Sequence, residues 1–92
     1  MTGIRRLVLD VLKPGDLSLV DMAADLGKLK NVQGVDIVVK DVDRRVEKVR
    51  ITVEGDDLDY STIKKRIEDD GASIQSVDRV SSGKEIIDKA CL

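Results

Sequence analysis

The stretch IRRLVLDVL (residues 4–12) decides the fold of this chain. Leu7, Leu9 and Val11 fall on one side of an extended backbone, and Arg6, Val8 and Asp10 fall on the other. A period of two in a run rich in aliphatic residues predicts a β-strand with one buried face. The strand is expected to stop at residues 13–16, KPGD, because proline cannot donate to a β-ladder and glycine relaxes the turn.

A helix is expected directly after this turn. Ser18 is a good N-cap residue, and Asp21 stands three positions later, at the spacing of a capping box. Apolar residues then follow at helical spacing and predict one buried helix face. They are Leu19, Met22, Ala23, Leu26 and Leu29.

The second half of the chain repeats this pattern after a β-hairpin. Residues 35–42 and 48–54 alternate as two strands around a polar turn at 43–45. Asp59 is expected to cap a second helix, with Ile63 and Ile67 facing inward and Gly71 just beyond its end. Residues 74–80 form the last strand. The apolar positions of that strand do not keep one parity, which indicates a β-bulge.

The predicted order β-α-β-β-α-β gives an α+β, two-layer sandwich of ferredoxin-like architecture. Right-handed crossovers predict an antiparallel sheet in the order 4-1-3-2. Residues 1–92 are expected to form a single domain, with a core at about 4–80 and a C-terminal tail at 81–92.

Composition excludes several function classes. Of the 92 residues, 16 are basic and 18 acidic, so no basic excess favours nucleic acid as a partner. Tyr60 is the only aromatic residue, whereas RNA-recognition domains stack bases on aromatic side chains of the central strands. The chain has no His and a single Cys, Cys91, which excludes an internal disulfide and a Cys/His metal site.

No apolar run is long enough for a membrane span, and the N-terminus lacks the core of a signal peptide. The cytoplasm is therefore the expected location, with no membrane partner. Catalysis has little support, because no Ser has an obvious base partner.

Acidic residues suggest one metal-binding hypothesis. We expect the first and third strands to run parallel at the centre of the sheet, so that the loops after them share one end, where ligands favour the strands' carboxyl ends. Those loops would bring together an acidic rim suited to Ca²⁺ or Mg²⁺, which prefer oxygen ligands. The rim consists of Asp10, Asp16, Asp56, Asp57 and Asp59. The alternative is a solvated acidic loop in which Asp59 only caps a helix.

The outer face of the sheet is expected to carry Val8, Val38 and Val77 among charged residues. A small sheet with such a face is often covered by another subunit, and pairing or ring closure would also satisfy its edge strands. Self-association is therefore expected.

Four segments carry a family resemblance: RRLVLDVLKP (residues 5–14), GVDI (34–37), EGDDLD (54–59) and GASIQSVDRV (71–80). They resemble segments of an archaeal family, domain-of-unknown-function family 211, and the opening block is the most specific of the four. The resemblance spans residues 4–87. It implies a ferredoxin-like fold, an archaeal cytoplasmic setting and multi-subunit assemblies, including rings, and it implies no activity.

Together these observations predict a non-enzymatic, self-associating domain. One form of it is a small-ligand sensor with the layout of amino-acid-binding regulatory (ACT) domains, which bind effectors near the loop after the first strand, here Lys13–Leu17. The alternative is a divalent-cation-binding protein that uses the acidic rim. An enzyme of unknown chemistry is the least favoured reading.

Overall fold

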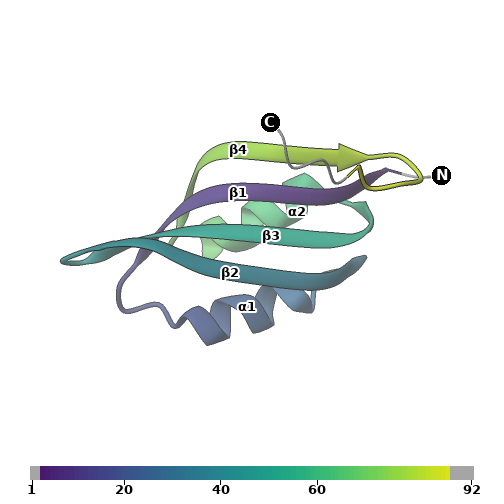
Figure 1. Cartoon of the computed structure of the whole chain (residues 1–92). Helices are drawn as coiled ribbons and strands as arrows, with labels where there is room; N and C mark the ends of the chain where they lie inside the picture. Colours follow the sequence, from purple (N-terminus) through teal and green to yellow (C-terminus); the bar gives the residue numbers. More distant parts are fainter. Residues whose placement is uncertain (1–2, 88–92) are drawn as a thin grey trace.

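Six elements follow one another in the computed structural model, which describes residues 3–87 (Figure 1). They occur in the predicted order of strands and helices. Their bounds are β1 Ile4–Pro14, α1 Leu19–Gly27, β2 Val32–Asp43, β3 Val46–Leu58, α2 Tyr60–Asp69 and β4 Ser73–Ser82.

The four strands form one antiparallel sheet in the order β2-β3-β1-β4. This confirms the predicted strand order and is consistent with a ferredoxin-like arrangement. The expectation that the first and third strands are parallel is wrong, because β1 pairs with β3 antiparallel along almost its whole length. The reason is topological. A β-α-β crossover returns β2 in the direction of β1, and the hairpin then reverses β3.

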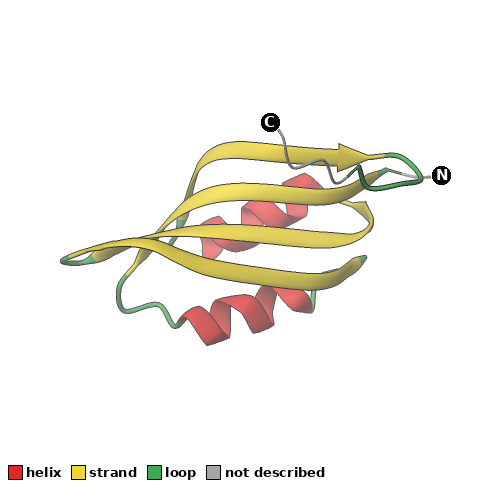
Figure 2. Cartoon of the chain, in the orientation of Figure 1, coloured by secondary structure: helices red, strands yellow, loops and turns green. Residues whose placement is uncertain are grey.

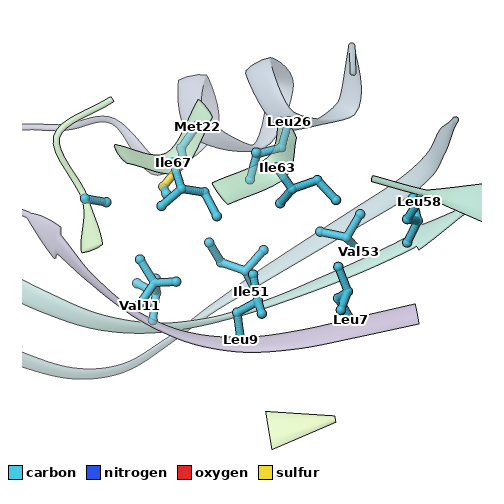
Figure 3. Packing of buried hydrophobic residues seen from close by; sticks show 12 residues of the cluster. Leu7, Leu9, Val11, Met22, Leu26, Ile51, Val53, Leu58, Ile63 and Ile67 are labelled. Carbon is cyan, nitrogen blue, oxygen red and sulfur yellow. The ribbon is translucent and has the colours of Figure 1, made fainter. Parts of the chain in front are cut away.

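Both helices lie on the same face of the sheet and leave the other face uncovered (Figure 2). The core fills the space between the two layers, as Figure 3 shows for the side chains of β1, β3 and the helices. Its alternating strand positions are the predicted ones. The buried apolar residues are Leu7, Leu9, Val11, Met22, Leu26, Val49, Ile51, Val53, Leu58, Ile63, Ile67 and Ala72.

The ends of the helices confirm the local signals in the sequence. Ser18 Oγ accepts a hydrogen bond from Asp21 N at 3.2 Å at the start of α1. Asp59 Oδ1 accepts from Ser61 N and Thr62 N at 3.0 and 3.4 Å at the start of α2. Gly71 follows α2 with a φ of 93°, the left-handed conformation expected of a glycine beyond a helix C-terminus.

The pairing of β4 with β1 has three register shifts, two of them within residues 74–80, which confirms the predicted bulge. These shifts keep Val77 opposite Leu9 and Val80 opposite Leu7, on the face that carries the helices. The expected position of Val77 on the outer face is therefore wrong. Val8 and Val38 do lie on that outer face, paired with Thr52 and Arg50 of β3.

Beyond β4, the described part of the tail is tied to the start of the chain. Gly83 N donates to Gly3 O at 3.1 Å, and Arg5 donates to Lys84 O at 2.9 Å. Cys91 lies outside the described residues. Within residues 3–87, neither helix has the length and apolar character that crossing a membrane requires.

Candidate functional site

The five carboxylates of the predicted acidic rim do not lie together. Because β1 and β3 are antiparallel, the loop that holds Asp16 lies at one end of the sheet. Asp56 and Asp57, in the last residues of β3, and the helix cap Asp59 lie at the opposite end. Asp10 lies between these ends on the outer face, where it pairs with Arg50 of β3. Within the described range, no three acidic or cysteine side chains are grouped in a way that could hold a metal ion.

The outer sheet face is instead covered by cross-strand ion pairs. Arg6 Nε lies 2.8 Å from Glu54 Oε2. Arg50 lies between two carboxylates, at 3.7 Å from Asp10 Oδ1 and 3.9 Å from Asp78 Oδ2. The Asp10 carboxylate is thus part of an ion-pair row that joins β1, β3 and β4, which accounts for it without a metal.

A depression lies where the α1–β2 turn meets the start of α2, and its volume is about 520 Å³. Its apolar walls come from both layers and include the only aromatic residue of the chain, Tyr60. The apolar lining residues are Ile4, Leu29, Leu58, Tyr60 and Ile63. Charged and polar side chains border the same depression, among them Lys30, Asn31, Asp57 and Asp59.

Two segments far apart in the sequence are fastened together at this depression. Asn31 Nδ2 donates to Asp57 O at 3.1 Å, and Asn31 O accepts from Asp56 N at 3.1 Å. Asn31 and Asp57 both have positive φ, 70° and 58°. Asn and Asp are the non-glycine residues that best tolerate this conformation. The shape of the depression therefore depends on a backbone conformation that Asn and Asp adopt more readily than other residues with a side chain.

Gly55 is required at the same junction. A Cβ atom at this position would collide with the backbone carbonyl oxygen of Asn31 and approach Leu58 at 2.7 Å. Only glycine lets the end of β3 approach the α1–β2 turn this closely.

A second hollow, of about 510 Å³, lies at the other end of the sheet. It is bordered by the β1–α1 loop at Gly15 and Asp16 and by Arg44, Arg45 and Glu47 of the hairpin. Gly15 N donates to Arg45 O at 2.8 Å, which fixes the loop against the hairpin. This is the loop where an ACT-like layout would place an effector.

A buried lysine supports that loop. Lys13 is only 2 % exposed, and its Nζ donates to Leu17 O at 2.6 Å and Pro14 O at 3.0 Å. Glu47 Oε1 lies 3.0 Å from the same nitrogen. These three oxygens satisfy an ammonium group that would otherwise be costly to bury. Its position on the inward side of β1, in register with Leu9 and Val11, was the only sequence signal for its burial.

One carboxyl group has a perturbed pKa. Burial raises the pKa of Asp70 above its ordinary value of 3.8, and the nearby Asp25 and Asp69 add to the effect while Arg66 opposes it. Asp70 Oδ2 is buried without a hydrogen-bond partner. Asp70 is the C-cap residue of α2 and lines neither depression. Its burial therefore lowers the stability of the fold at that helix end.

The four-stranded antiparallel sheet with two helices on one face makes this chain a small α+β protein. The chain belongs to domain-of-unknown-function family 211 (DUF211), described as uncharacterized ArCR, whose pattern matches residues 5–91. It is 46 % identical over 89 residues to "Uncharacterized protein MJ0319" of the archaeon Methanocaldococcus jannaschii, a match that covers 97 % of this chain and 92 % of the relative. The predicted family is confirmed, and neither description names an enzyme activity or a ligand.

Proposed function

We propose that this chain is a non-enzymatic, ferredoxin-like domain that assembles with copies of itself through the two edge strands of its sheet. The observation that carries this proposal is the exposure of valines on both edges. Val39 and Val42 of β2 are 40 % and 65 % exposed, and Val77 and Val80 of β4 are 43 % and 54 % exposed.

These valines share the helix-bearing face of the sheet. Val39 pairs with the buried Val49, and Val77 and Val80 pair with the buried Leu9 and Leu7. They are therefore in register with the core, yet they lie at the sheet edges, where neither helix covers them fully. Large aliphatic side chains in such positions favour contact with another apolar surface.

The strand directions favour pairing between unlike edges. Each strand of the sheet is antiparallel to its neighbours, so β2 and β4 run in opposite directions. A β4 edge from one copy next to a β2 edge from another would continue the antiparallel alternation. The valines of β4 lie level with Ile37 and Val35 of β2, so a shift of the two strands along each other would bring them beside Val39 and Val42. Such a contact joins different surfaces, and repeated rotation by the same angle closes it into a ring. It would also satisfy the open amides and carbonyls of both edges.

The test is the mass of the chain in solution, measured by light scattering after size exclusion. We expect a wild-type mass that is a multiple of 10.1 kDa. Val80→Lys should lower it, because an edge lysine prevents strand pairing. Val20→Lys is the matched control, since Val20 is 76 % exposed on α1 and belongs to neither edge strand. A monomeric wild type, or equal loss of mass in both variants, would contradict the proposal.

A sensor of ACT-like layout is the second candidate. Its support is the hollow beside the loop Lys13–Leu17, where Arg44 and Arg45 border a space of about 510 Å³. Neither guanidinium forms an ion pair within residues 3–87, which suits an anionic effector. A rise in melting temperature with small dicarboxylates or phosphates that is lost in Arg44→Ala would support this role. Equal shifts in both proteins would count against it.

A further inference from the structure

We propose that the depression between the α1–β2 turn and the start of α2 binds a free amino acid with an aliphatic side chain. This site is separate from the proposed edge contacts, because none of the four edge valines lines it. Three features of the depression carry the inference: its apolar walls, its unpaired carboxylate and its unpaired ammonium group.

The apolar walls fit an aliphatic side chain. Leu58 and Ile63 are buried core residues at the base, and Ile4, Leu29 and Tyr60 pack against the same core. The volume of about 520 Å³ is within the range of small-molecule sites, which are apolar with a few polar groups that fix orientation. A small aliphatic group would displace water from these apolar side chains, whereas a hydrated ion would leave them in contact with water.

The charges around the opening favour a ligand with an ammonium group. The first amides of α2 would normally attract an anion, but Asp59 Oδ1 already accepts from Ser61 N and Thr62 N. The carboxylate of Asp57 has no ion pair or hydrogen bond of its own among the described residues. It is therefore available to an ammonium group, and the Tyr60 ring lines the same space.

Lys30 makes a zwitterion a better match than a simple amine. Its ammonium group is exposed at the border of the depression and, like Asp57, has no ion pair within residues 3–87. It would repel a ligand with a positive charge alone, but it can pair with a carboxylate. A metal ion is a poorer match, because hard cations need several converging oxygen ligands and no such group forms in the described chain.

The probes are L-leucine, isoamylamine and 4-methylpentanoate, which share an aliphatic body and differ in charge. In a titration of the full chain followed by amide NMR, leucine should change the amide chemical shifts of residues 29–31 and 57–63. Leucine should also bind about tenfold more tightly than either analogue. Equal affinity for 4-methylpentanoate would overturn the role of Asp57, and equal affinity for isoamylamine would overturn that of Lys30. Absence of shifts at these residues with leucine would overturn the site itself.

Variants test the same assignments. Asp57→Asn keeps a residue that tolerates positive φ and should lower the affinity for leucine about tenfold. Asp21→Asn makes the same charge change in the first turn of α1, where the residue lines neither depression, and should leave leucine affinity unchanged. Equal effects of the two substitutions would mean that only net charge matters. Displacement of leucine by Ca²⁺ in the wild type but not in Asp57→Asn would assign the site to a metal instead.

Discussion

The ammonium nitrogen of Lys13 lies 3.0 Å from Oε1 of Glu47, and this ion pair joins the end of β1 to the base of the β2–β3 hairpin. Lys13 is 2 % exposed, whereas the Glu47 side chain is 25 % exposed. The ion pair therefore matters more for Lys13, which is shielded from water, than for Glu47, which water still reaches. Removing Glu47 leaves a buried charge with two carbonyl partners, and a buried charge that loses its counter-ion is costly.

We expect Glu47→Ala to lower the free energy of unfolding by about 2 kcal/mol, less than for a fully buried pair because water reaches Glu47. Urea denaturation measures the change. Glu68→Ala on the exposed side of α2 is the matched control and should change the free energy by less than about 0.5 kcal/mol. Similar losses in the two variants would show that Lys13 does not depend on its carboxylate.

The raised pKa of Asp70 predicts a pH-dependent cost. Its cause is burial, with Asp25 nearby. A carboxyl group whose pKa is higher in the folded than in the unfolded chain favours folding when protonated. Stability is therefore lost as pH rises from the ordinary value of 3.8 through the folded pKa. We expect Asp70→Asn to be more stable than wild type at pH 7, by about 0.5 kcal/mol as for a like-charge helix pair. Thermal unfolding should show this gain disappearing below pH 3.8. If Asp70→Asn is stabilised equally at pH 7 and below pH 3.8, the gain in stability comes from hydrogen bonding and not from removal of the charge.

Divalent cations are expected to leave the melting temperature unchanged. The acidic rim is divided between two ends of the sheet and the outer face, and Asp59 is used as a helix cap. Calorimetry with CaCl₂, MgCl₂ or a chelator tests this expectation. A rise in melting temperature with Ca²⁺ that Asp56→Asn abolishes would show that the carboxylates near α2 suffice for a cation site.

Local patterns predicted most of the fold. The alternation of Leu7, Leu9 and Val11 identified the central strand, and Ser18 and Asp59 marked both helix starts, because these signals involve residues within one turn of each other. The strand order followed from crossover handedness. The direction of β3 relative to β1 was wrongly predicted. It depends on two steps taken together, the crossover that returns β2 parallel to β1 and the hairpin that then reverses β3.

The sites could not be predicted from local patterns. The burial of Lys13 depends on Glu47, and the depression beside α2 depends on the contact between Asn31 and Asp57, so each arises from segments distant in the sequence. Their charge alone makes Asp57 and Asp59 candidate metal ligands in the sequence. Their apolar neighbours Leu29 and Ile4 come from other elements, and only the folded chain shows them in one depression.

Gly55 offers the sharpest test of the junction that forms this depression. Gly55→Ala would place its Cβ against the Asn31 carbonyl oxygen, so β3 or the α1–β2 turn must shift. We expect a loss of about 2–3 kcal/mol, the cost of overpacking against a backbone that cannot move freely. Gly34→Ala on the neighbouring strand is the matched control, because nothing lies within 4 Å of its added Cβ. It should change stability by less than about 1 kcal/mol. If urea denaturation gives equal effects at the two positions, the close approach of Gly55 to Asn31 is not maintained in solution.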